Sequence, residues 1–272
     1  MTLGNHQRTG SWRPLMLGMP LVALLILPIV ALCFAASPSD ILAGAKHPHF
    51  TSALWLSLRT SLISMAILVG FGTPLAWWLA TAPRRRTRWL EMFVDLPIIL
   101  PPAVVGVALL LAFGHQGLLG RPLHVMGLSV SFTSTAVVLA QIVVAAPFYL
   151  QSAASAFRRI DSDQILVART LGQSPMGAFM RVTLPMALPG ISVGAALAWA
   201  RALGEFGATL LFAGNLPGTT QTVPLAIYAA LETDVRIAIA LSLVLAAFAI
   251  FLLAIVRTSP RLMNLGLERH ES

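Results

Sequence analysis

One segment of the chain has the spacing of a catalytic motif. Gly190-Ile191-Ser192-Val193-Gly194 fits Gly-x-Ser-x-Gly, in which a serine nucleophile stands on a sharp turn. Such a serine needs a general base within hydrogen-bond reach, but all six histidines lie outside the long apolar stretches. We therefore interpret the two glycines as a small-xxx-small surface for close helix packing. No catalytic residue is expected.

The same apolar stretch contains two opposite charges, Arg201 and Glu205. Residues four apart share one face of a helix, so these side chains are expected to pair. Small residues crowd around them, as in a helix that packs closely among others. Two interpretations stay open: the pair lines or braces an ion path, or it is a buried pair that fixes the helix register.

Composition assigns the chain to a membrane. Of its 272 residues, 57% are hydrophobic and only 10% are charged, whereas soluble proteins carry about 25% charged residues. The net charge of +8 comes from basic residues placed between apolar runs, which a membrane explains better than a nucleic-acid partner. The fold class expected is an all-α, polytopic membrane helix bundle.

Two kinds of site are excluded by residue counts. The single cysteine, Cys33, rules out an intramolecular disulfide and a cysteine-based metal cluster, and no metal site is expected elsewhere. The only lysine, Lys46, is not part of a Gly-x-x-x-x-Gly-Lys-Ser/Thr loop, so the chain lacks that means of binding ATP phosphates.

About six stretches are long enough for a membrane-spanning helix, which needs about 20 apolar residues. Pro83–Arg88 is expected to form a tight polar turn between the second and third. Pro97, Pro101 and Pro102 remove backbone donors and must bend or break the third. Because a broken helix is tolerated in a membrane only where it is buried or lines a cavity, the third and fifth spans are predicted to line the pathway. The six stretches are 14–36, 54–81, 90–113, 134–157, 187–213 and 237–256.

Basic residues in short loops predict the orientation. With the N-terminus inside, 13 of the 18 basic residues fall in cytoplasmic segments. Both termini are therefore expected in the cytoplasm. We interpret the first stretch as a signal anchor or first span, since Pro38 makes a poor cleavage site. The 13 residues are Arg8, Arg13, Arg84, Arg85, Arg86, Arg88, Arg158, Arg159, Arg169, Arg181, Arg257, Arg261 and Arg269.

The segment of about 158–185 is too polar to span a membrane and too apolar for a free loop. A short helix broken by Gly172 and Pro175 would expose an apolar patch rimmed by arginines, which usually marks a partner site. A helix lying on the bilayer surface is the alternative. The patch is expected to contain Leu171, Met176, Phe179 and Met180.

This segment resembles the "EAA" signature of ABC importer permeases, Glu-Ala-Ala-x3-Gly-x9-Ile-x-Leu-Pro. Val167 and Ala168 fall at the two alanines, Gly172 at the glycine and Val182 at the isoleucine, and Leu184-Pro185 completes the pattern. Leu166 departs from it, since the family often has Glu there. The resemblance implies a type I importer permease fold with a cytoplasmic coupling helix that docks on a separate ATPase subunit.

The resemblance extends from the second to the sixth stretch and is closest to the branch that transports sulfate and molybdate. It implies import of molybdate, with tungstate nearly isosteric, and leaves a sulfate or thiosulfate permease as the first alternative. A proton-coupled secondary transporter, with Arg201 and Glu205 as relay, is the second. The similar segments are Leu96–Gly106, Arg201–Ala208, Phe212–Asn215 and, for molybdate permeases in particular, Pro217–Tyr228.

The family assembly implied consists of two copies of this chain, two ATPase subunits and one periplasmic or tethered molybdate-binding protein, in a bacterial plasma (inner) membrane. ATP and Mg²⁺ would be held by the ATPase, with no cofactor on this chain and no nucleic acid. The expected divisions are 1–50 for the N-terminal tail, first span and external loop, 51–257 for the permease domain, and 258–272 for a cytoplasmic tail.

The orientation can be tested by cysteine labelling. In a chain with Cys33 replaced, a cysteine at Ser174 should react with an impermeant thiol reagent only after the cells are opened. A cysteine within 215–234, expected outside, is the positive control. Labelling at position 174 in intact cells would overturn the topology.

Overall fold

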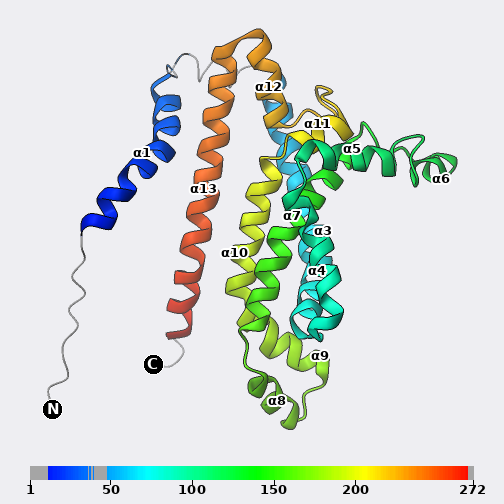
Figure 1. Ribbon diagram of the computed structural model, residues 1–272, viewed down its shortest axis with the longest axis vertical. Coiled ribbons are helices and arrows are strands. Elements are labelled where there is room, and N and C mark those ends of the chain that lie inside the picture. Colours follow the sequence, from blue (N-terminus) through cyan, green and yellow to red (C-terminus); the bar gives the residue numbers. More distant parts are fainter. Residues whose placement is uncertain (1–11, 36, 38, 40–47, 269–272) are drawn as a thin grey trace.

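Helices form most of the described chain, residues 12–35, 37, 39 and 48–268 of the computed structural model, and no strand occurs among them (Figure 1). The long helices run roughly side by side, while α5 and α6 extend sideways from the bundle. The elements are α1 (Trp12–Ala35), α3 (Pro48–Thr81), α4 (Arg84–Ile99), α5 (Pro102–Phe113), α6 (Gly120–Val125), α7 (Ser134–Arg158), α8 (Ser162–Thr170), α9 (Pro175–Ala178), a π-helical turn (Phe179–Thr183), α10 (Leu184–Leu203), α11 (Gly207–Ala213), α12 (Val223–Thr233) and α13 (Val235–Glu268).

The centre of the bundle is α7, which packs against both α3 and α10. Short polar side chains on the inner face of α3 hydrogen-bond to its neighbours. Ser64 Oγ donates to Gln141 Oε1 of α7 at 3.0 Å, and Trp199 Nε1 of α10 donates to Ser61 Oγ at 3.0 Å. In an apolar surrounding such interhelical hydrogen bonds hold helices together that hydrophobicity alone does not.

The contact between α7 and α10 depends on two glycines. A Cβ added at Gly190 would lie 2.5 Å from Ala156 Cβ, and one at Gly194 would lie 2.6 Å from Ser152 Cβ. Ser192, between them, donates its hydroxyl to the carbonyl oxygen of Pro189 at 2.8 Å. These contacts agree with the packing interpretation of the Gly-x-Ser-x-Gly segment.

Two expected spans are broken, and one expected turn is helical. α4 and α5 meet at an angle of 115°, as the prolines require. The stretch 187–213 was expected as one helix and is two, because α10 ends at Leu203 and α11 begins at Gly207. The expected turn Pro83–Arg88 is also wrong: Arg84–Arg88 open α4, because arginine is a good helix former and proline is tolerated at the residue before a helix.

Four helical stretches among the described residues are long and apolar enough to cross a membrane, and the bent pair α4–α5 would make a fifth. The four are Met16–Ala35, Phe50–Thr81, Ser134–Arg158 and Pro175–Leu203. α13 begins at Val235, and its apolar part, Val235–Phe251, is shorter than these four stretches. The segment 215–234, expected as an external loop, contains the apolar helix α12, which packs with α3 and α13. Most of the other expected external loop, 37–49, lies outside the described residues.

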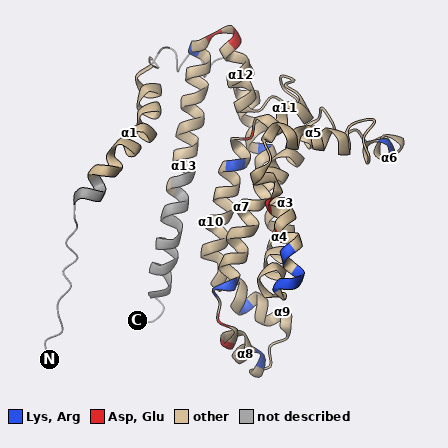
Figure 2. Ribbon diagram, viewed as in Figure 1, with Lys and Arg blue, Asp and Glu red and all other residues tan. Residues whose placement is uncertain are grey.

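Basic side chains gather at the end of the bundle that carries α8 and α9 (Figure 2). This end includes the start of α4, the end of α7 and the segment between α7 and α10. The opposite end carries Glu232, Asp234 and Arg236 at the junction of α12 and α13. The two ends of the long helices therefore differ in charge, as the sequence analysis expects of a cytoplasmic and an external face.

The α7–α10 contact can be tested with two glycine substitutions. Gly194→Ala should lower the free energy of unfolding in detergent by about 1–3 kcal/mol, because the new methyl group would overlap Ser152. Gly70→Ala on α3, where a Cβ meets nothing within 4 Å, should be neutral or stabilising by about 1 kcal/mol. Equal thermal stability of the two variants would contradict the packing interpretation.

Candidate functional site

The break between α10 and α11 is bridged by a buried carboxylate. Glu205 has a side chain that is 0% exposed, and its Oε1 accepts a hydrogen bond from the backbone N–H of Ala208 at 2.8 Å. That N–H belongs to the first turn of α11, where the helix itself offers no acceptor. The carboxylate therefore satisfies the start of one helix, where a negative charge is also favoured by the helix dipole.

The same carboxylate pairs with the end of the other helix. Arg201 Nη1 of α10 lies 2.6 Å from Glu205 Oε2. The pair expected from the sequence is present, although Glu205 stands just past the end of α10 and not within a continuous helix. The contact is an ion pair by distance, while Oε2 has no hydrogen-bond partner within the described ranges. Arg201 keeps 29% of its side chain exposed, so its side of the ion pair stays accessible.

The two broken spans meet near their breaks. A Cβ at Gly106 of α5 would lie 2.9 Å from the carbonyl oxygen of Ala208, and one at Gly207 of α11 would lie 3.0 Å from Pro102 Cβ. Pro101 and Pro102 stand at the N-cap and first position of α5, where a missing N–H is tolerated. Pro97 lies inside α4, close to its end.

This arrangement can present a tempered positive charge to a passing anion. A cation that bound an anion tightly would hold it, whereas conduction requires weak binding. The Glu205 carboxylate lowers the net charge beside the guanidinium of Arg201, whose side chain is partly exposed. The chain is also irregular at this point, which is tolerated in a membrane only within protein or beside a cavity.

A second candidate site is the segment between α7 and α10. Asp161 caps α8 by accepting the N–H of Asp163, and Ser174 caps α9 by accepting the N–H of Gly177. Gly172 ends α8 with a φ of +88°, a conformation that favours glycine. Gly172 N–H bonds to Arg169 O and Gln173 N–H to Ala168 O, the two hydrogen bonds of a Schellman motif.

Apolar side chains cover the outside of this segment. Leu171 is 79% exposed, and Met176 and Met180 are more than half exposed. The prediction that Phe179 belongs to this patch is wrong. The centroid of its ring lies 4.7 Å from that of Trp77 on α3. It packs inward because the π-helical turn directs it toward the bundle. We call the exposed group the apolar loop patch; it consists of Leu166, Val167, Leu171, Met176 and Met180.

The remaining signature residues differ in burial. Ala168 is buried, and Leu184 packs against the core cluster of α3, α7 and α10. Pro185 is exposed at the second position of α10. Some signature residues, such as Val167, are therefore exposed, whereas Ala168 is buried and Leu184 packs against the bundle.

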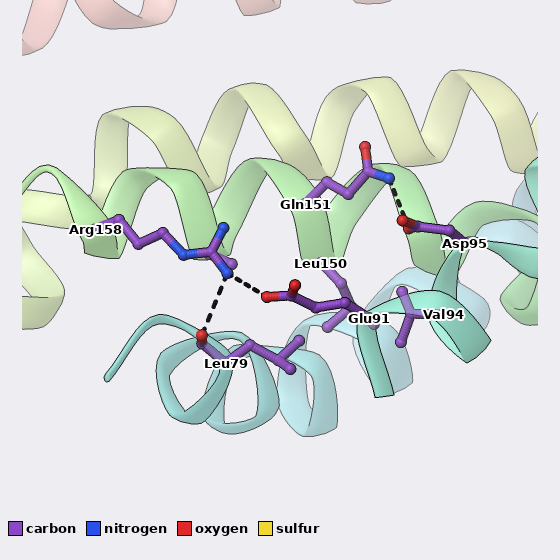
Figure 3. A pocket seen from close by; sticks show the side chains of 8 residues that line it. Leu79, Glu91, Val94, Asp95, Leu150, Gln151 and Arg158 are labelled. Atoms are coloured by element: carbon purple, nitrogen blue, oxygen red, sulfur yellow. Dashed lines mark hydrogen bonds and ion pairs between the residues drawn. The ribbon is translucent and has the colours of Figure 1, made fainter. Parts of the chain in front are cut away.

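Sequence analysis missed a polar contact between α4 and α7 (Figure 3). Arg158 Nη2 lies 2.5 Å from Glu91 Oε1, and Gln151 Nε2 donates to Asp95 Oδ1 at 2.7 Å. The signal was available: the two carboxylates are four residues apart and the two donors seven apart, so each pair shares a helix face. Arg158 had been counted only as an orientation signal.

The part of the chain that the structure describes has no group of three or more His, Cys, Asp or Glu side chains able to hold a metal ion. Two exposed histidines, His115 and His124, lie with ring centroids 5.2 Å apart near α6. Two such ligands are fewer than a structural metal site uses.

The fold, its broken spans and the capped segment define a membrane transport permease. Residues 72–264 match the family described as "Binding-protein-dependent transport system inner membrane component". The chain belongs to this family.

Relatives of the chain carry more specific names. It is 44% identical over 224 residues to the "Molybdenum transport system permease protein ModB" of Mycobacterium tuberculosis. The aligned region covers 82% of this chain and 85% of the relative. Identity to the ModB protein of Escherichia coli K12 is 38% over 182 residues, covering 66% and 80%. The "Probable transport system permease protein NifC" of Clostridium pasteurianum is 37% identical over 239 residues, covering 88% and 84%.

Solved structures share the fold at lower identity. A chain of a bacterial ABC transporter "involved in the import of the acidic polysaccharide alginate" superposes with a TM-score of 0.69 at 17% identity, covering 93% of this chain and 95% of that one. A chain of the MetNI methionine ABC transporter gives a TM-score of 0.62 at 18% identity, covering 78% and 94%. These likenesses establish the type I importer permease architecture.

The buried pair can be tested by a double-mutant cycle. Arg201→Ala should lower membrane abundance and thermal stability, because it leaves the buried Glu205 carboxylate uncompensated. Breaking a fully buried pair costs about 3–5 kcal/mol, and less is expected here because Arg201 is partly exposed. Glu205→Ala should also destabilise, and the double variant should recover in part.

The matched control is Arg59→Ala, which removes an exposed arginine of α3 that makes no ion pair in the described part of the chain. It should leave abundance unchanged. A double variant no more stable than Arg201→Ala would show that the two charges do not stabilise each other.

Proposed function

We propose that this chain is the membrane-spanning permease subunit of an ATP-driven importer that carries molybdate, and the nearly isosteric tungstate, into a bacterial cell. The observation that carries the proposal is the 44% identity, over most of both chains, to a relative named as a molybdenum transport permease. The partly exposed Arg201, paired with Glu205, supports an anionic substrate.

In the proposed mechanism, ATP is hydrolysed on a separate subunit. The apolar loop patch, at the basic end of the bundle, supplies a docking surface for that ATPase, since exposed apolar patches of this kind mark partner sites. Val167, Leu171 and Met176 would enter its groove. Phe179 and Leu184 would transmit the movement, because they pack against the core cluster of α3, α7 and α10. Ala168 would hold α8 within the segment, and Pro185 stands where the segment enters α10.

The proposed assembly has two copies of this chain, two ATPase subunits and one molybdate-binding protein on the outer face. Both termini would lie in the cytoplasm, with the basic end of the bundle, because positive charge favours that side. The binding protein would choose the anion, and Arg201 and Glu205 would flank the pathway as a structural pair with Pro97, Pro101 and Pro102 shaping it.

The proposal is tested by purifying the chain from membranes with its neighbouring ATPase and reconstituting both with the binding protein in vesicles. Molybdate should enter only with ATP, and sulfate should not compete at equal concentration. Uptake driven by a proton gradient without an ATPase would favour a secondary transporter, and preferential sulfate uptake would favour the sulfate branch.

Gly172 should be a coupling residue. Gly172→Asp places a side chain on a backbone with φ +88°, where an L residue costs about 1–2 kcal/mol, and projects it into open space where the partner would dock. We expect normal insertion with uptake reduced about tenfold or more, equivalent to about 1.4 kcal/mol of lost docking free energy. Uptake and ATPase copurification are measured together.

The matched control is Gly127→Asp, because Gly127 has a φ of +75° and equally open surroundings but lies between α6 and α7. It introduces the same backbone strain away from the proposed docking surface, so uptake should be near normal. Equal uptake by the two variants would contradict the coupling role of Gly172.

A further inference from the structure

We infer that Arg158, Glu91, Gln151 and Asp95 form a polar clamp that positions the broken spans during transport. The clamp makes α4 follow the segment between α7 and α10, residues 159–183, which we call the coupling segment. These four are positioning residues, since none is placed against the anion. The inference rests on the proposed function, because it assigns a role within ATP-driven transport. It adds a link between two sites that the sequence analysis treated separately.

The clamp stands at the last turn of α7, directly before the coupling segment. Arg158 Nη2 contacts Glu91 Oε1 of α4 at 2.5 Å and also donates to the carbonyl oxygen of Leu79 of α3 at 3.3 Å. One guanidinium therefore joins three helices. Two turns back along α7, Gln151 binds Asp95 and adds a second point of attachment. Two contacts fix the position of α4 along α7 as well as its distance.

Leu90 and Val94 pack α4 against the core cluster, and the polar contacts lie beside two open pockets. Cavities of about 180 Å³ and 220 Å³ lie beside the Arg158–Glu91 pair, and both are lined by Leu79, Glu91 and Arg158. Figure 3 shows the polar side chains of α4 and α7 directed toward one another across the first cavity. Away from this contact, Trp89 and Phe93 of α4 are more than 60% exposed.

The helices on either side of the clamp lead to the two functional regions. After Arg158 the chain enters the coupling segment, which is also attached by Phe179 to Trp77 and Phe157. After Asp95, α4 ends at the proline break, and α5 packs through Gly106 on Ala208, the residue whose N–H binds Glu205. A displacement of the coupling segment thus has a continuous packed route to the Arg201–Glu205 pair.

The energetics favour positioning over stability. The Arg158 and Glu91 side chains are 49% and 33% exposed, and a pair exposed to that degree contributes about 0–1 kcal/mol. Its loss should leave the protein folded. It should instead widen the range of positions that α4 takes relative to α7 and the coupling segment.

The experiment uses the full permease–ATPase complex in vesicles with the binding protein, and measures ATP hydrolysed per molybdate imported. Glu91→Gln and Arg158→Gln should each raise this ratio at least about threefold at normal abundance. The exchanged pair Glu91→Arg/Arg158→Glu should return it to within about twofold of the wild-type value. The matched control, Arg159→Gln, removes the adjacent exposed arginine and should leave the ratio unchanged.

A second measurement keeps the inference independent of the substrate. In a Cys33→Ser chain, spin labels at Met92 of α4 and Leu171 after α8 report the distance between α4 and the coupling segment. In the permease alone this distance should be narrowly distributed, and should broaden in Glu91→Gln but not in Arg159→Gln. A distribution unaffected by Glu91→Gln would overturn the clamp, as would unchanged ATP-to-molybdate ratios in both single variants. Absence of molybdate uptake by the wild-type complex, with the label result intact, would count against the proposed function only.

Discussion

The buried carboxylate of Glu205 is the interaction on which the interior of this permease depends. A chain that breaks within a bilayer exposes backbone groups that lipid cannot satisfy, and a carboxylate removed from water needs compensation of its own. Glu205 meets both needs at once, because it accepts the N–H of Ala208 at the start of α11 and pairs with Arg201 at the end of α10. The break and the charge therefore stabilise each other.

The second break is fitted to the first by small residues and prolines. α5 begins with Pro102, which has no N–H to satisfy, and it approaches α11 so closely that a methyl group at Gly106 or Gly207 would meet atoms 2.9–3.0 Å away. Close helix approach through small residues is the way that membrane helices gain dispersion contacts. The irregular parts of the two spans thus pack against each other near the partly exposed Arg201.

Much of this could be predicted from local sequence rules, and the rest depends on tertiary partners. Apolar runs predict the spanning helices, the prolines after Asp95 predict the break of the third, and the spacing of Arg201 and Glu205 predicts their pair. The break after Leu203 was missed because alanine and leucine around it favour a continuous helix, and the glycine at 204 is a weak signal alone. Phe179 was misplaced because its inward direction depends on a π-helical turn and on Trp77, which no pattern within the segment reveals. The partners of Glu91 and Asp95 were missed for the same reason, since periodicity identifies a shared face but not the helix that it meets.

The Arg201–Glu205 pair and the Arg158–Glu91 pair differ in strength, and the difference suits their proposed roles. The Arg201–Glu205 pair has one fully buried member, so separating it leaves a charge in a low-dielectric site and is strongly opposed. The Arg158–Glu91 pair is reached by water, so it can break and re-form at little cost. In the proposed mechanism both kinds have a use. The strong pair keeps the local geometry of the break, and the weak pair lets α4 and α7 restore their contact after each conformational change. Because the weak pair is linked to the strong one through α4 and α5, the free energy delivered at the coupling segment would be used to move the broken spans as units and not to pull Arg201 from Glu205.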